Sequence, residues 1–310
     1  MQDTLFYLTQ FLDRKGLERG NGNGHKKIIE DPAARFIPVW DSKNLFAKNT
    51  SLPVLLEKHQ IPFPEEAIFL GLTEGKYFLA TFIKDHSELS AEVMAKTEWA
   101  RLRSKSENIP HEENALLAFA AYLSNWHASA QYCGRCGYKT ISTKGGFART
   151  CLNPEKAHDQ FPRTDAAMIV LVEHDGRCLL GRKANWPVGR YSVLAGFVEA
   201  MESVEETIRR EVYEETNINV ISSTYVSSQP WPFPASLMLG YRAQASNEEV
   251  ILHDGELENA RWFSREVFTE ELLSGRLKLP SFTSISHHLI KQWFEEGGDS
   301  FADLLEKVPS

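Results

Sequence analysis

One stretch, from Gly196 to Ile218, restricts the fold of this chain more than any other. It reads GFVEAMESVEETIRREVYEETNI, and its glutamates recur at helical spacing. Glu211 and Glu215 are four residues apart, so they share one face of the predicted helix, where like charges repel. A hard divalent cation such as Mg²⁺, which prefers oxygen ligands and acts alongside substrate phosphates, would offset this repulsion. The opposite, buried stripe is predicted to consist of Val204, Ile208 and Val212.

A second motif, SQPWPFPAS at residues 228–236, follows this helix. Three prolines in five residues exclude a regular helix or a central strand. We therefore expect a stiff, extended loop that presents Trp231 and Phe233. Rigidly held aromatic faces suit stacking on a flat base, which contributes about 1–3 kcal/mol per base in nucleic-acid complexes. The alternative is a proline-aromatic turn buried in a core.

The spacing of three cysteines predicts a small metal-binding module. Cys133 and Cys136 form a C-x2-C pair, and Cys151 follows fifteen residues later, a pattern that suits tetrahedral zinc. After Cys151, His158 is the nearest side chain able to complete a Cys3His site. A degenerate, metal-free module is the alternative. Cys178 lies in a strand-like run and is expected to be a buried apolar residue.

Composition limits the class of protein. The chain has 310 residues, of which 42% are hydrophobic and 25% charged, which suits a globular protein of two or three domains. A net charge of −8 argues against a general nucleic-acid-binding surface. No apolar run approaches the roughly 20 residues of a membrane span. The absence of a secretory signal and the few cysteines lead us to expect a cytoplasmic protein without a membrane partner.

The two motifs together carry a family resemblance. The first matches G-x5-E-x7-R-E-U-x-E-E-x-G-U (U is a bulky aliphatic residue), so the chain is identified as a member of the Nudix hydrolases. It departs at the second glycine, where Asn217 stands; asparagine is the next-best residue for a left-handed helix cap. Met201 replaces a loop glycine of many relatives. SQPWPFP resembles the signature of the NADH pyrophosphatases within this family.

The resemblance implies a fold class and a domain order. The class is α+β, with a Nudix α/β/α sandwich preceded by a zinc ribbon and a strand-rich N-terminal domain. The predicted domains are 1–127, a mixed domain that ends in a helix over Glu112–Ala130; 128–162, the zinc-ribbon-like module; and 163–310, the Nudix domain. The glycine-rich segment Gly20–Gly24 is expected to be a flexible linker.

The resemblance also implies an activity. The family hydrolyses the pyrophosphate of NADH or NAD to (reduced) nicotinamide mononucleotide and AMP, and bacterial members remove NAD caps from RNA. Relatives use Mg²⁺ or Mn²⁺ and form homodimers that share the proline-rich loop. The alternatives are a Nudix hydrolase with another substrate, such as ADP-ribose, and a non-catalytic NAD-binding module. Intact glutamates in REVYEE argue against the latter.

Site residues are carried over position by position. The implied catalytic residues are Glu211, Glu214, Glu215 and Glu256, which with the Ala195 carbonyl are also the implied Mg²⁺ or Mn²⁺ ligands. Arg210 is expected to orient the glutamates and Glu202 to support them. The implied zinc ligands are Cys133, Cys136, Cys151 and His158. The implied substrate-binding residues are Phe161, Phe197, Gln229, Pro230, Trp231, Pro232, Phe233, Pro234, Ala235, Ser236 and Ser286.

Overall fold

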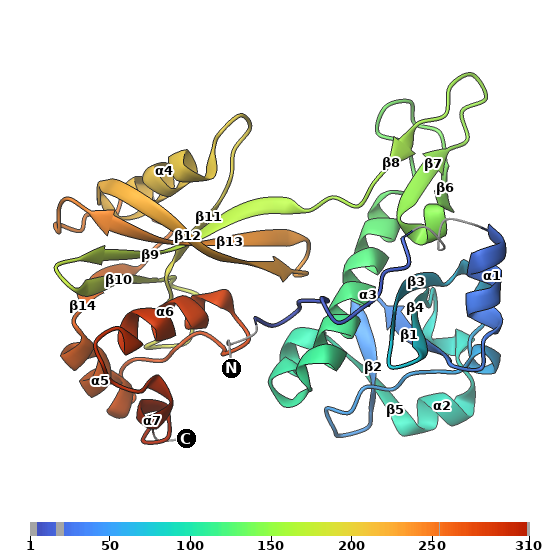
Figure 1. Cartoon of the computed structure of the whole chain (residues 1–310), viewed down its shortest axis with the longest axis horizontal. Coiled ribbons are helices and arrows are strands. Elements are labelled where there is room, and N and C mark those ends of the chain that lie inside the picture. The colour runs from blue at the N-terminus through green and yellow to red at the C-terminus, as the bar shows by residue number, and fades with distance from the viewer. Residues whose placement is uncertain (1–4, 17–21, 254, 309–310) are drawn as a thin grey trace. The chain divides into compact units, whose positions relative to one another are not determined.

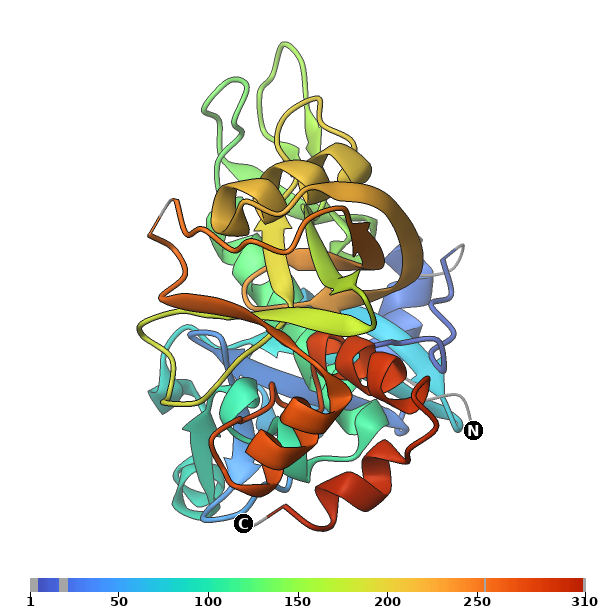
Figure 2. The same cartoon turned by 90° about the vertical axis from the view of Figure 1, so that its left-hand side faces the viewer.

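The computed structural model describes residues 5–16, 22–253 and 255–308, which form two compact units (Figures 1 and 2). The N-terminal unit comprises Phe6–Thr164 and Pro232–Ala235. Of the described residues, the C-terminal unit comprises Leu5, Asp165–Trp231 and residues 236–253 and 255–308. Each unit has hydrophobic clusters of its own.

A five-stranded sheet in the order β3-β4-β1-β2-β5 forms the described core of the N-terminal unit. Strand β1 runs parallel to β4, and the other neighbours are antiparallel. The strands are β1 (Ala34–Trp40), β2 (Lys43–Ala47), β3 (Ile68–Thr73), β4 (Lys76–Phe82) and β5 (Thr97–Ala100). The connecting 3-10 turns are η1 (Lys58–Gln60), η2 (Pro64–Glu66), η3 (His86–Glu88), η4 (Leu102–Ser104) and η5 (Ser106–Asn108). The helices are α1 (Gly22–Glu30), α2 (Ala91–Lys96) and α3 (His111–Ser129).

Helix α3 confirms the helix predicted over Glu112–Ala130 and lies against β1 and β4 of this sheet. Its buried residues include Leu116, Leu117, Ala120 and Leu123. None of the helices in the described parts of the chain is long and apolar enough to cross a bilayer.

The glycine-rich segment was predicted to be a linker, and this is wrong for its second half. Gly20 and Asn21 lie outside the described residues, but Gly22 to Gly24 open α1. A helical glycine costs about 1 kcal/mol relative to alanine. The same helix buries Ile28 and Ile29 in the core of the N-terminal unit, which offsets that cost.

A small three-stranded sheet follows α3 and carries the cysteines. Its antiparallel strands are β6 (Thr140–Thr143), β7 (Ala148–Cys151) and β8 (Asp159–Gln160), with the turn η6 (Lys144–Gly146) between the first two. We call this sheet with its loops, residues 131–161, the ribbon. Figure 1 shows two long loops that extend beyond its strands.

The C-terminal unit is a sheet covered by helices on both faces, which confirms the predicted sandwich. The described sheet has the order β12-β13-β9-β10-β14, and β11 pairs with β9. Alternate residues of β9 point to opposite layers: Val170 packs with α4, whereas Leu171 packs with α5, α6 and α7. The strands are β9 (Asp165–His174), β10 (Arg177–Arg182), β11 (Leu194–Phe197), β12 (Val220–Trp231), β13 (Ser236–Ala245) and β14 (Asn259–Phe263). The helices are α4 (Val204–Thr216), α5 (Arg265–Leu273), α6 (Ile285–Glu295) and α7 (Phe301–Leu305).

The proline-rich motif is more regular than predicted. Its first half is not a loop: β12 continues through Trp231, and Pro230 stands opposite Leu237 of β13. The turn is confined to Pro232–Ala235. Strand β12 lies at the edge of the sheet. A proline is tolerated there because its nitrogen, which has no hydrogen to donate, can face away from the neighbouring strand. The prolines therefore exclude a central strand but permit an edge strand.

Candidate metal and substrate sites

Helix α4 carries the box glutamates and is capped at both ends. Ser203 caps its start and forms a reciprocal capping box with Glu206. At its end, Asn217 adopts the left-handed conformation with φ +63°, and its N–H donates to the carbonyl of Tyr213 at 2.8 Å. Asparagine thus fills the conformational role expected of the missing glycine. The buried stripe is also confirmed, because Ile208 and Val212 are buried and Val204 packs against them.

Gly196 makes room for the carboxyl group of Glu211. Strand β11 places Gly196 opposite Met168 of β9, directly after Ala195. A Cβ atom at position 196 would lie 2.0 Å from Cδ of Glu211, far inside any tolerable contact. The glycine therefore lets the Glu211 carboxylate lie directly against the backbone of β11, beside the residue whose carbonyl is the predicted metal ligand.

Arg210 connects three of the acidic side chains. Its guanidinium donates to both carboxylate oxygens of Glu202 at 2.8 Å, and it lies 3.0 Å from Glu211 and 3.1 Å from Glu214. It also donates to the Phe197 carbonyl at 3.1 Å. The bonds from Arg210 lower the pKa of Glu202 to about 2, and this carboxylate in turn raises the pKa of the arginine. Arg210 and Glu202 thus have the orienting and supporting geometry that was expected of them.

Glu211 experiences two opposing influences. Burial raises the pKa of its carboxyl group above the ordinary value, whereas Arg210 lowers it. The negative charges of Glu214 and Glu256 raise that pKa further. Three of the predicted metal-binding glutamates are therefore near enough to interact electrostatically. The fourth, Glu215, lies on the same helix and is only 2% exposed.

Glu256 reaches the site from outside the box. It precedes β14, and the Lys183 ammonium donates to its carboxylate at 2.8 Å. Sequence reasoning missed Lys183, which follows β10 and belongs to no motif. The one feature that could have indicated its role is its position directly after β10, the strand that pairs with β14. The Lys183 ammonium thus places positive charge beside Glu256.

The acidic side chains provide hard oxygen donors of the kind that Mg²⁺ and Mn²⁺ prefer. Across the described residues, however, the four glutamates do not form a group whose ligand atoms all lie within 4.8 Å, as the cysteine–histidine group does. Instead, Arg210 lies beside Glu211 and Glu214, and Lys183 lies beside Glu256. The donor set therefore fits a divalent cation.

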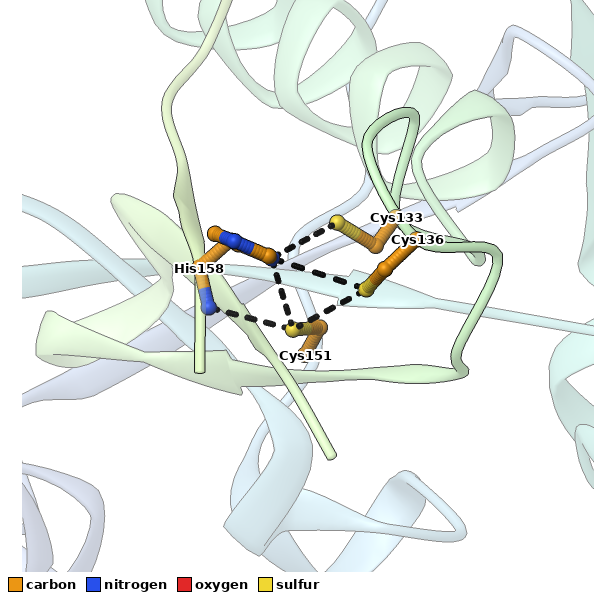
Figure 3. A group of neighbouring side chains, drawn as sticks. All are labelled: Cys133, Cys136, Cys151 and His158. Atoms are coloured by element: carbon orange, nitrogen blue, oxygen red, sulfur yellow. Dashed lines mark hydrogen bonds between the residues drawn. The ribbon is translucent and has the colours of Figure 1, made fainter. Parts of the chain in front are cut away.

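The cysteines and His158 of the ribbon form a compact group (Figure 3). The sulfur atoms of Cys136 and Cys151 are 3.8 Å apart. Nδ1 of His158 lies 3.5–3.7 Å from all three sulfur atoms. A tetrahedral zinc ion with bonds of about 2.3 Å to sulfur and about 2.0 Å to nitrogen requires sulfur–sulfur edges of about 3.8 Å and sulfur–nitrogen edges of about 3.5 Å. The residues therefore fit a Cys3His zinc site, with Nδ1 as the histidine ligand atom.

The two predicted aromatic contacts are both exposed, but they lie in different units. Phe197, at the end of β11 in the C-terminal unit, is 60% exposed. Phe161, after β8 in the N-terminal unit, is 58% exposed, and the Lys144 ammonium lies 4.8 Å from its ring centre. Neither ring is part of a hydrophobic core, and both are accessible to a ligand.

The proline-rich segment and α6 are connected by buried polar groups. Gln229 is buried; its amide donates to the Thr283 carbonyl at 2.9 Å and accepts from the Ile285 N–H at 2.8 Å. Ser286 is also buried and lies 2.7 Å from Ser192, oxygen to oxygen. These side chains hold the start of α6, a role that the sequence did not indicate. As substrate contacts, they and the rest of the hairpin, residues 230–236, remain predictions.

Comparisons with known proteins agree with both motifs. A NUDIX domain model matches residues 162–282, and a model of the NADH pyrophosphatase-like rudimentary NUDIX domain matches residues 33–126. The NAD-capped RNA hydrolase NudC of Mycobacterium bovis is 37% identical over 241 residues, which cover 74% of this chain and 76% of that protein. The human NAD-capped RNA hydrolase NUDT12 is 38% identical over 196 residues, 60% of this chain and 42% of that protein. A NUDIX hydrolase structure from Nitrosomonas europaea matches 55% of this chain and 94% of its own at 19% identity, with a TM-score of 0.44.

Proposed function

Because this chain belongs to the NADH pyrophosphatase-like Nudix hydrolases, we infer that it hydrolyses the pyrophosphate of NADH and NAD to nicotinamide mononucleotide and AMP. The same cleavage of a 5′-terminal NAD removes the cap from NAD-capped RNA, the substrate named for its relatives. The observation that carries this inference is the placement of Glu211 against Gly196, with the other box glutamates on the same helix.

The chemistry is substitution at phosphorus by water, and its obstacle is the negative charge on the phosphoryl oxygens. A bound Mg²⁺ or Mn²⁺ would neutralise that charge and acidify the attacking water. Glu211, Glu214, Glu215 and Glu256, with the Ala195 carbonyl, are the proposed ligands, and Glu214 is also a candidate to accept the water proton. Arg210 keeps the carboxylates of the helix oriented. Lys183 supplies positive charge beside Glu256.

A zinc ion in the ribbon would be structural. Its proposed ligands are Cys133, Cys136, Cys151 and His158, which leave no open position for water or substrate. The ribbon sheet has only three short strands, so a bound metal would stabilise it considerably.

The dinucleotide would be held by aromatic stacking and by the hairpin. Phe161 and Phe197 are proposed to contact the nicotinamide or adenine ring, and residues 229–236 and Ser286 to surround the substrate. We also propose a cytoplasmic homodimer in which Trp231 reaches the partner subunit's site. Exposure of both phenylalanine rings supports the stacking role.

The direct test is incubation of the purified protein with NADH and either Mg²⁺ or Mn²⁺. Equal amounts of AMP and reduced nicotinamide mononucleotide are expected. Glu215→Gln should abolish turnover while circular dichroism and thermal unfolding stay close to those of the wild type. If the protein hydrolyses NADH slowly and ADP-ribose fast, its main substrate is instead another nucleotide such as ADP-ribose. Binding of NAD without hydrolysis of any nucleotide would indicate a non-catalytic module.

A further inference from the structure

The metal end of the ribbon carries an unusual surface. Three large side chains are exposed there: Tyr132 at 67%, Leu152 at 51% and Tyr138 at 47%. Three cations, Arg135, Lys139 and Lys156, lie in the same loops and are also exposed. These six residues are called the ribbon patch below.

Strand register places part of this patch on one face. Lys139 forms a β-bridge with Tyr132, and its carbonyl accepts a hydrogen bond from the N–H of Leu152. Residues directly opposite one another in antiparallel strands share a face, so the Lys139 side chain lies between the other two. The face is therefore an exposed row of one aromatic, one cationic and one aliphatic side chain, and no folded part of the ribbon covers it.

The charge of the ribbon is opposite to that of the whole chain. Residues 128–162 contain five Lys and Arg and two Asp and Glu, whereas the whole chain has a net charge of −8. Even with three thiolates and one Zn²⁺, which together add one negative charge, the segment stays positive. Asp159 is engaged by Lys144 and Thr150, so it does not neutralise the patch.

The cations of the patch are available for a ligand. In the described residues, neither a hydrogen bond nor an ion pair engages the side-chain nitrogens of Arg135, Lys139 or Lys156. Glu155, also exposed, is the acidic neighbour within these loops, and it forms no ion pair with them. Three unpaired cations interspersed with two exposed tyrosines match a surface that follows a phosphate backbone and stacks on unpaired bases.

We propose that the ribbon patch binds the single-stranded RNA chain of a capped substrate. This proposal rests on the proposed removal of NAD caps, and it makes the ribbon a substrate-binding element as well as a structural one. It refines the expectation from the overall charge, which argued against a general nucleic-acid-binding surface, because the charge that decides binding at one patch is local. Self-association through this face would bring its unpaired cations together, which electrostatic repulsion opposes.

The test compares two triple variants of the full-length protein. Arg135→Ala, Lys139→Ala and Lys156→Ala together remove the cations of the patch. Lys26→Ala, Lys27→Ala and Lys48→Ala remove the same charge from exposed positions elsewhere in the N-terminal unit. Fluorescence anisotropy with an uncapped, unstructured RNA of about a dozen nucleotides measures binding, a length that suits one single-strand site. Zinc content confirms that the ribbon remains intact.

The patch variant should bind this RNA at least about tenfold more weakly than the wild type, whereas the control variant should not. The slope of log affinity against log salt should fall by about 2, the value for three phosphate contacts on a single strand. Tyr132→Ala should weaken binding and Tyr132→Phe should restore it, because stacking needs the ring and not the hydroxyl.

Catalysis separates this proposal from the proposed function. For the patch variant, KM for NAD-capped RNA should rise. With NADH as the substrate, both kcat and KM should stay unchanged. Equal effects of both triple variants, or unchanged RNA binding in a protein that hydrolyses NADH, would overturn the patch assignment alone. A change of oligomeric state in the patch variant would assign the face to contact between copies and also overturn it. Absence of NADH hydrolysis in the wild type would instead contradict the proposed function.

Discussion

At the scale of single residues, the site depends on a close approach that only glycine permits. The Glu211 carboxyl group occupies the space that a Cβ atom at position 196 would need. Arg210 also contacts Glu211 and Glu214, and it is itself fixed by Glu202. The orientation of these carboxylates thus depends on two residues: Gly196, which has no side chain to obstruct Glu211, and Arg210, whose guanidinium contacts both carboxylates.

Gly196→Ala is predicted to lower kcat/KM for NADH by about 100-fold, the typical cost of displacing a catalytic group by about 1 Å. The new methyl group would push the Glu211 carboxylate away from β11. Steady-state kinetics with NADH and Mg²⁺ would measure this change. Gly16→Ala is the control, because nothing lies within 4 Å of a Cβ there. Equal rates for both variants would show that the contact with Gly196 is not needed.

At the scale of elements, the ends of α4 decide where the glutamates stand. Ser203 and Glu206 close the first turn, and Asn217 closes the last in the left-handed conformation. The helix therefore begins and ends at defined residues, and the Glu211–Glu215 face keeps its position relative to β11.

Asn217→Ala is predicted to destabilise the C-terminal unit by about 1 kcal/mol, because an ordinary residue is strained at positive φ. Asn217→Gly should stay within about 0.5 kcal/mol of the wild type, since glycine adopts this conformation freely. Thermal unfolding of the three proteins would measure the difference. A more stable alanine variant than glycine variant would contradict this account of the cap.

A second element-scale feature joins α3 to the ribbon. His127 is buried between the Gly146 carbonyl, 2.8 Å from Nε2, and the Arg149 guanidinium, 2.8 Å from Nδ1. Arginine can only donate, so Nδ1 accepts and Nε2 carries the hydrogen of a neutral ring. Burial is the main cause that lowers the pKa of His127 from 6.5 to about 4.

This histidine makes stability depend on pH in one direction. Between pH 6.5 and about 4 the unfolded chain binds a proton at His127 that the folded chain excludes, so stability is lost as pH falls through this window. The loss attributable to this group is at most about 3 kcal/mol. Unfolding of wild type and His127→Gln should be followed across this range. The difference between the two proteins should shrink as pH falls, and a constant difference would contradict the assignment.

At the scale of the whole molecule, the chain consists of two units with separate cores. The ribbon has only three short strands, and the Cys3His group joins the loops beside them. We therefore expect metal binding to decide the stability of the ribbon without affecting that of the C-terminal unit.

The purified protein is predicted to contain one zinc per chain. His158→Ala should lower this content, whereas His158→Cys should preserve it, because a fourth thiolate can complete a tetrahedral site. Removal of zinc by a chelator should increase amide exchange in residues 131–161 and leave α4 protected. Elemental analysis and hydrogen exchange measure the two effects. A full zinc content in His158→Ala would exclude the histidine as a ligand.

The sequence by itself determined the features that depend on local spacing. The helix with its glutamate face, its C-terminal cap at Asn217, and the donor set of the ribbon all follow from residues that are close along the chain. Backbone geometry places residues four apart on one helical face in any context, so these predictions needed no knowledge of the packing.

The tertiary structure alone decided the contacts between distant segments. Strand register brings Gly196 beneath Glu211 and Lys183 beside Glu256, and it makes the first half of the proline-rich motif an edge strand. The same packing makes Gln229 a support for α6. These arrangements depend on how strands pair and helices cover them, and that pairing is set by burial across the whole unit, which no short sequence pattern encodes.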